Sequence, residues 1–135
     1  MEYEIFDHEA DIGIRGFGKT LEEAFENGAK AMSSIMVELE TVEPKVKKEI
    51  ECDAEDEEAL FVTWLNQIRA LLDIDGMVFS EFKVEIRENR LKGWAKGEVL
   101  DHKKHTLGED VKAATYHLLK IEKKERYMVQ CIVDL

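Results

Sequence analysis

The sequence predicts an α+β fold, a single compact domain over residues 1–135 in which a mostly antiparallel β-sheet packs against two helices. Two segments of the first half carry apolar residues at helical spacing, which predicts the helices. In the second half, strand-like segments follow one another directly, which indicates hairpins rather than strand–helix–strand units. A chain of 135 residues has room for one domain, and a domain of this size buries roughly 68% of its unfolded surface. It therefore builds a real core without disulfide bonds.

The first predicted elements are two short strands and a helix. Tyr3–Phe6 and Asp11–Phe17 have strand character, and the polar residues 7–10 between them predict a turn. Thr20 and Glu23 then match a capping box, in which the threonine hydroxyl accepts a main-chain hydrogen bond and the glutamate reaches back. Apolar residues recur at helical spacing after this cap, so we expect a helix of about four turns.

A third strand and a second helix are predicted next. Val46, Ile50 and Cys52 alternate with charged residues, as in a half-exposed strand. Residues 53–58 supply a helix cap and first-turn carboxylates, which the positive end of a helix dipole favours. The apolar stripe of this helix comprises Leu60, Phe61, Trp64, Leu65, Ile68, Leu71 and Leu72. Gly76 marks the turn after it, because glycine adopts the positive φ that a tight turn needs.

Two hairpins are predicted to complete the sheet. In the first, Met77–Arg87 pairs with Leu91–Val99; in the second, Lys112–Glu122 pairs with Arg126–Asp134. The arm over residues 112–122 is ambiguous, because some of its apolar residues also recur at helical spacing. His117 falls within this arm, where we expect a structural, hydrogen-bonded histidine.

Composition restricts the possible partners and compartment. Thirty acidic residues against 19 basic ones give a net charge of −11, which disfavours a chain that binds nucleic acid alone and favours a basic protein partner or a hard cation. No uncharged apolar run approaches the ~18 residues of a membrane span, and the acidic N-terminus differs from a signal peptide. We therefore expect a soluble cytoplasmic protein without membrane contact. Cys52 and Cys131 lie in strand-like alternations and are expected to be buried free thiols.

One motif suggests a nucleotide site. Residues 13–20 read GIRGFGKT and match the phosphate-loop pattern G-x-x-x-x-G-K-[ST], in which Lys19 would bind phosphate and Thr20 magnesium. The context disfavours this interpretation, because Ile12 and Ile14 extend strand character into the loop and two helices cannot wrap the required parallel sheet. A strand-to-helix turn is preferred. A nucleotide-binding P-loop protein or a small metal-dependent phosphohydrolase is the alternative function.

Two aspartates form a candidate cation site. Asp11 opens the second predicted strand and Asp134 closes the last one, so an antiparallel pairing of these strands brings their opposed Cβ atoms about 4.5–5.5 Å apart. Two carboxylates at that distance repel, so one is protonated or a cation lies between them. The terminal carboxylate of Leu135 is a further candidate ligand, and an all-oxygen set suits Mg²⁺, Ca²⁺ or Mn²⁺ rather than zinc. The alternative is that Asp11 only ends a turn and Asp134 lies in a frayed terminus.

The histidines give a weaker signal. His8 lies between two acidic residues, and His102 and His105 flank two lysines in a segment that reads as a polar loop. Such a loop either carries contact residues or is simply solvated. The two Asp-His pairs in the sequence suggest a metallohydrolase, but no spacing defines the several ligands of a hydrolytic site. Nothing in this pattern requires catalysis.

These residues also carry a family resemblance. Residues 3–14, which read YEIFDHEADIGI, resemble the N-terminal signature of archease, written D-H-T-A-D-[IV]-G-[IV]. Three further segments resemble that family in the expected order: residues 58–66, Lys104-His105 followed by residues 111–117, and residues 132–135. Together these segments span nearly the whole chain, which makes the resemblance far more specific than the phosphate-loop match.

The resemblance implies an activator protein rather than an enzyme. Archeases assist the RtcB-type tRNA-splicing ligase, promote guanylylation of its active-site histidine and allow multiple turnovers, so RNA would be met only through the ligase. The resemblance also implies a metal site at Asp11, Asp134 and Leu135, with Ca²⁺, Mg²⁺ or Mn²⁺ as the divalent cation. It assigns to the partner-binding surface a further set of residues, namely Asp7, His8, Lys104, His105 and Asp110.

This sequence departs from the family pattern at two of these places. Glu9 stands where threonine is usual, which adds negative charge beside the expected site. Asp110 stands where a glutamate is expected, so the side chain at this position is one methylene shorter.

Overall fold

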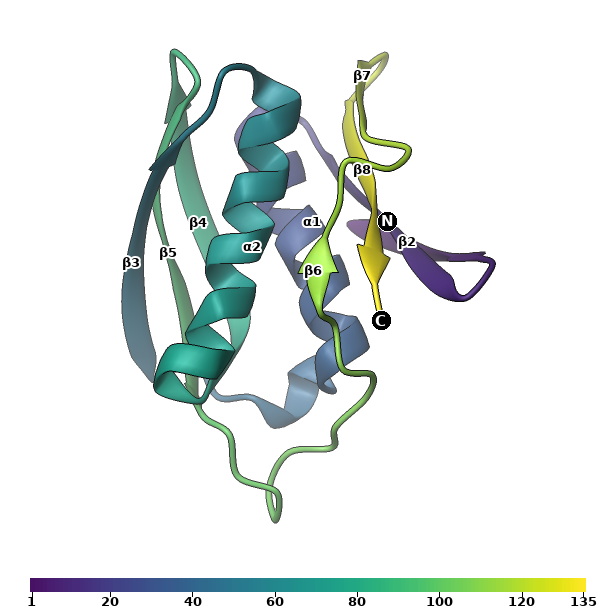
Figure 1. Cartoon of the computed structure of the whole chain (residues 1–135). Helices are drawn as coiled ribbons and strands as arrows, with labels where there is room; N and C mark the ends of the chain where they lie inside the picture. The colour runs from purple at the N-terminus through teal and green to yellow at the C-terminus, as the bar shows by residue number, and fades with distance from the viewer.

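Two antiparallel sheets enclose both helices in the computed structural model, which describes the whole chain, residues 1–135 (Figure 1). The larger sheet has the order β1-β2-β8-β6, with β7 also paired to β8. Its strands are β1 (Tyr3–His8), β2 (Asp11–Gly18), β6 (Ala113–Ala114), β7 (Lys120–Lys123) and β8 (Tyr127–Asp134). The smaller sheet has the order β3-β5-β4, with β3 (Val46–Asp53), β4 (Met77–Arg87) and β5 (Arg90–Val99).

The helices α1 (Leu21–Met36) and α2 (Glu57–Asp75) form the middle layer, and a 3₁₀ turn, η1 (Leu39–Thr41), follows α1. Helix α1 contacts β2 and β8 on one side and β4 on the other, while α2 contacts strands of both sheets. The predicted α+β class is therefore confirmed, and all strand pairs are antiparallel. The strands form two sheets rather than one, because each helix is apolar on more than one side and needs cover on both.

Both helices begin at the predicted caps, and α2 also ends at the predicted glycine. The Thr20 hydroxyl accepts a hydrogen bond from the Glu23 main-chain N–H (3.1 Å), and the Glu23 carboxylate accepts one from the Lys19 N–H (3.1 Å). Asp56 caps α2 by accepting the Ala59 N–H at 2.7 Å. Gly76 ends that helix in the left-handed region, at φ 65°.

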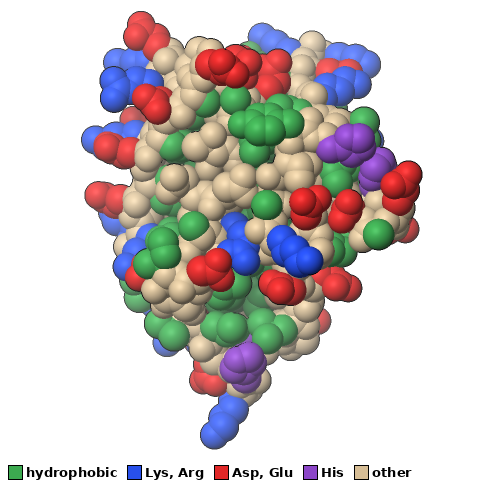
Figure 2. Space-filling model, viewed as in Figure 1, with side chains coloured by type: hydrophobic (Ala, Val, Ile, Leu, Met, Phe, Trp, Pro, Cys, Tyr) green, Lys and Arg blue, Asp and Glu red, His purple; other side chains and the backbone are tan.

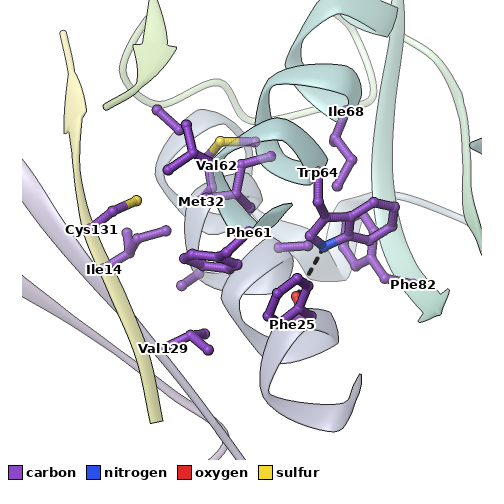
Figure 3. Close-up of a cluster of buried hydrophobic side chains, with 14 of the residues drawn as sticks. Ile14, Phe25, Met32, Phe61, Val62, Trp64, Ile68, Phe82, Val129 and Cys131 are labelled. Carbon is purple, nitrogen blue, oxygen red and sulfur yellow. Dashed lines mark hydrogen bonds between the residues drawn. The ribbon is translucent and has the colours of Figure 1, made fainter. Parts of the chain in front are cut away.

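The core lies where the helices meet each other and the two sheets. The rings of Phe25 of α1 and Phe61 of α2 pack at a tilt with their centroids 5.1 Å apart, and the Trp64 indole N–H donates to the Phe25 carbonyl at 3.1 Å (Figure 3). Cys131 of β8 is buried in the same cluster, and Cys52 is half-buried. Both thiols are free, as predicted, and burial raises the pKa of Cys131 to about 12 and that of Cys52 to about 11.

The predicted strand over residues 112–122 is interrupted: its two ends, β6 and β7, pair with β8 as expected, but residues 115–119 between them form a loop. Ala114 pairs with Val133 and Lys120 with Gln130, so five residues on this arm face two residues of β8, and three extra residues must loop out. Leu118 sits in the loop at φ 51°, and the Gln130 side chain donates to its carbonyl at 2.9 Å. His117 therefore lies exposed in the loop and not in a strand.

The N-terminal hairpin also differs from the predicted one. Asp7 and His8 continue β1 as far as its last residue, so the turn shrinks to Glu9 and Ala10, with Glu9 at φ 53°. The other hairpin agrees with the sequence prediction, since β4 and β5 turn at Glu88 and Asn89, both at positive φ.

Residues 13–18 of the phosphate-loop pattern fall within β2, which is extended through Gly18 and lies between β1 and β8. Its glycines serve packing: a Cβ on Gly16 would lie 2.3 Å from the Ala24 oxygen and the Gly28 nitrogen of α1. The Thr20 hydroxyl is already used by the helix cap. The preferred interpretation, a strand followed by a capped helix, is confirmed. Neither helix is long and apolar enough to cross a membrane.

The close approach of β2 to α1 gives a stability prediction. We expect Gly16→Ala to lower the free energy of unfolding by about 3 kcal/mol or more, because the new methyl group meets backbone atoms that cannot turn aside. Gly76→Ala is the control, since open space surrounds Gly76 and only its positive φ penalises alanine, by about 1 kcal/mol. Urea unfolding of both variants checks this, and equal losses would contradict it.

Candidate functional site

The register of β2 against β8 brings the two candidate aspartates together. Ile12 is paired with Val133, so the next position along each strand sets Asp11 opposite Asp134. The Leu135 main-chain N–H donates to Asp11 Oδ1 at 3.4 Å, which ties the two strand ends to each other. The expected meeting of the start of one strand with the end of the other is confirmed.

Both carboxylates lie on the outer face of the larger sheet. Side chains alternate along a strand, and Ile14, Cys131 and Val133 are fully buried against the helices. Asp11 and Asp134 occupy the opposite phase of the same strands, so they point away from the core. Asp134 is exposed and Asp11 is partly exposed, and both are accessible to an ion or a partner.

His8 lies on the same face of the sheet as Asp11, and Asp7 does not. His8 is paired with Asp11, and it shares the outer face with Phe6, whose ring lies over Gly13. The His8 ring meets that of His117 edge-on, with centroids 4.9 Å apart, and its Nδ1 atom is buried without a hydrogen-bond partner. Asp7 occupies the other phase of β1, and its side chain is directed to the other face.

Figure 2 agrees with this arrangement: histidine side chains gather beside acidic ones on the side where Figure 1 places the tip of the β1–β2 hairpin. Asp11, Asp134 and a main-chain oxygen of Leu135 offer only oxygen ligands, which fits a hard cation such as Ca²⁺ or Mg²⁺. No group of three or more His, Cys, Asp or Glu side chains is arranged to hold a metal ion. The two aspartates alone therefore do not form a complete set of metal ligands.

The structure places Lys104 and His105 in a second cluster, in the loop between β5 and β6. Lys104 Nζ donates to Glu43 Oε1 and to Glu98 Oε1, both at 2.9 Å. Glu98 also accepts the Glu43 main-chain N–H at 2.8 Å and contacts His105 Nε2 at 2.9 Å. We name Glu43, Glu98, Lys104 and His105 the loop cluster.

His105 is an internal support of this cluster. Its side chain is fully buried, and its Nδ1 accepts the Asp101 main-chain N–H at 2.9 Å. Since Nδ1 accepts, the proton lies on Nε2, which donates to Glu98. The His105 ring is therefore turned inward in this conformation, where it supports Glu98, and the predicted contact with a partner stays a prediction.

Hydrogen bonds shift the acid–base behaviour of the loop cluster. The Glu43 main-chain N–H, His105 and Lys104 together lower the pKa of Glu98 to about 2. Lys104 and Lys45 lower the pKa of Glu43, and the two carboxylates raise the pKa of Lys104. All three side chains therefore stay charged at neutral pH.

Asp110 is exposed on the segment that leads from the loop cluster to the carboxylate site. Val111 next to it is buried, with its carbonyl accepting from Arg69 at 2.7 Å, and the Lys112 N–H donates to the Asp134 carbonyl at 2.9 Å. Sequence reasoning missed Glu43 and Glu98, because nothing in their local sequence marks two glutamates 55 residues apart as neighbours.

The fold and the site together define a small α+β protein with two sheets around two helices and an exposed carboxylate pair on an open sheet face. Residues 3–135 match the model of the Archease protein family (MTH1598/TM1083). The chain belongs to the archease family.

Relatives support this assignment over the full length. "Protein archease" of Thermococcus gammatolerans is 45% identical over 98% of each chain, and that of Thermococcus kodakarensis is 46% identical over 99% of each. Protein 1598 of Methanobacterium thermoautotrophicum, solved in solution, superposes with a TM-score of 0.86 at 34% identity, covering 99% of both chains. An archease of Thermotoga maritima, titled a possible chaperone, gives a TM-score of 0.63 at 26% identity, covering 96% of this chain and 94% of that one.

The loop cluster makes a pH prediction. The folded-state pKa of Glu98 lies at about 2, below its ordinary value of 4.5, so its contribution to stability is present above pH 4.5 and is lost as the pH falls toward 2. Glu98→Gln should therefore be less stable than the wild type at pH 6, with the gap closing between pH 4.5 and 2. Urea unfolding at several pH values checks this. Glu40→Gln, an exposed and unpaired control, should show no such closing gap.

Proposed function

We propose that this protein activates an RtcB-type RNA ligase in the cytoplasm by promoting guanylylation and multiple turnover of the ligase, and that it is not itself an enzyme. Membership of the archease family supports this function. The observation that carries it is the β2–β8 register, which sets Asp11 and Asp134 side by side on an accessible sheet face. Ligase recognition, and not RNA binding, is the primary interaction.

Asp11, Asp134 and Leu135 are proposed to hold one divalent cation, Ca²⁺, Mg²⁺ or Mn²⁺. The pair of carboxylates repels itself, so an ion between them is favoured, and the Leu135 N–H orients the Asp11 carboxylate through its hydrogen bond. When bound near a reacting phosphoryl group, such an ion stabilises developing negative charge. Because two aspartates and the chain terminus supply few ligands, water or groups of the ligase would fill the remaining positions.

The remaining contact residues are proposed to orient the ligase. His8 lies beside Asp11 on the same face, and its buried, unpartnered Nδ1 atom is available to a partner group after a small rotation of the ring. Lys104 is held by two carboxylates and offers a positive group within an acidic surface. Asp7 and Asp110 are exposed acidic residues suited to a basic partner.

Asp134→Ala should abolish stimulation of ligase guanylylation, because it removes a proposed ligand of the cation. The fold should stay intact, because the lost carboxylate is exposed and is repelled by Asp11. A guanylylation time course with purified ligase, with and without this protein, measures the effect. Glu55→Ala is the matched control, an exposed acidic residue outside the site. Full stimulation by Asp134→Ala would reject the metal role.

Cation binding is testable without the ligase. Calorimetric titration with Ca²⁺, Mg²⁺ and Mn²⁺ should give one saturable site, lost in Asp11→Asn and Asp134→Asn but kept in Glu55→Gln. At a hundredfold excess of ion over its Kd, the free energy of unfolding should rise by about 2.7 kcal/mol. Equal binding by all variants would place the ion elsewhere.

A further inference from the structure

The outer face of the larger sheet carries a second feature at the end of β2 opposite to the aspartates. At ~3.3 Å per residue along the strand, it lies about 20 Å from them. A hollow of about 690 Å³ opens there around Phe17 and Met128, which are paired across β2 and β8. Phe17 points outward because Gly16 and Gly18 face α1. Lys19, Lys124 and Arg126 surround the hollow, and all three are exposed.

The charge of this hollow differs from that of the chain as a whole. Among its acidic residues, Glu4 is paired with Arg15 and Glu122 with Lys120. Lys19, Lys124 and Arg126 form no ion pair, and Glu125 is the one unpaired carboxylate that lines the hollow. The local balance is therefore positive on a protein whose net charge is −11. The hydrogen bond from Lys120, and then the charges of Lys124 and Arg15, lower the pKa of Glu122.

The hollow also offers planar groups. The Arg126 guanidinium lies over the Phe17 ring, 4.1 Å from its centroid, and donates to the Met1 carbonyl at 3.0 Å. A guanidinium that is stacked on an aromatic ring presents its other face to solvent. RNA bases stack on aromatic rings and on arginine guanidinium groups. Cations and stacking planes occur together at sites for single-stranded nucleic acid.

We propose that the hollow bounded by Phe17, Lys19, Lys124 and Arg126 binds a single-stranded segment of RNA. The phosphates lie against the three cations, and a base stacks on Phe17 or on the Arg126 guanidinium. An acidic peptide would use the cations but would have no use for the stacking planes, which is why RNA is favoured. This revises the expectation drawn from net charge, because the cations that line the hollow outnumber its three carboxylates.

Binding of a fluorescein-labelled 12-nucleotide RNA of mixed sequence, measured by anisotropy with the protein alone at 50 mM salt, tests the proposal. The triple variant Lys19→Gln, Lys124→Gln, Arg126→Gln should bind at least tenfold more weakly. The slope of log affinity against log salt should be less steep by about 2, at ~0.7 for each phosphate that is no longer neutralised. The control is Lys47→Gln, Lys83→Gln, Arg87→Gln. This control variant removes two lysine charges and one arginine charge, all exposed and unpaired, from the smaller sheet. It should bind the RNA as tightly as the wild type does.

A second arm separates bases from charge. Phe17→Leu should weaken binding of the RNA about tenfold, and it should leave binding of an abasic oligomer of equal charge unchanged. No RNA binding by the wild type, equal losses in the two triple variants, or tighter binding of a polyglutamate peptide would each overturn the proposal. Because no ligase is present, these outcomes are independent of the proposed activation, which the guanylylation assay tests separately.

Discussion

The antiparallel pairing of β2 with β8 is the interaction on which the rest of this structure depends. It joins residues 11–18 to residues 127–134 in the middle of the larger sheet, so neither end of the chain has a fixed position without it. The glycines of β2 let α1 approach the same strand closely, and α1 in turn carries the smaller sheet on its other side. The site and the core are therefore stabilised by the same pairing.

This pairing also decides which side chains share a face. Residues of one phase on β2 and β8 make the core, and those of the other phase form an outer face that runs from a pair of carboxylates to a ring of cations around Phe17. A shift of β8 by one residue in register would bury Asp134 and expose the core residues of that strand instead. Burial of the core residues fixes the register of the strands, and this register in turn keeps the polar residues on the outer face.

The loop cluster shows a different way of placing a functional side chain. Lys104 is held by Glu43 and Glu98, which come from segments far apart in the chain, and the buried ring of His105 supports Glu98 from behind. Lys104-His105 marks this loop in the sequence, but the partners that orient it do not. In the same way, Asn66 bonds both main-chain groups of Ala114, and Gln130 binds the Leu118 carbonyl, which holds the chain in a loop where a strand was predicted.

The sequence alone determined the elements whose signals are local. Thr20, Asp56 and Gly76 set the ends of the helices because a cap depends on neighbouring residues, and positive φ at Glu88 and Asn89 closes a hairpin between alternating strands. The sequence also singled out Asp11 and Asp134 as strand ends, although their meeting was conditional on which strands are neighbours. Only the tertiary structure decided the division into two sheets, the loop at residues 115–119, the burial of His105 and the separation of His8 from Asp7. Each of these depends on contacts between residues distant in sequence, or on strand register, which local spacing does not encode.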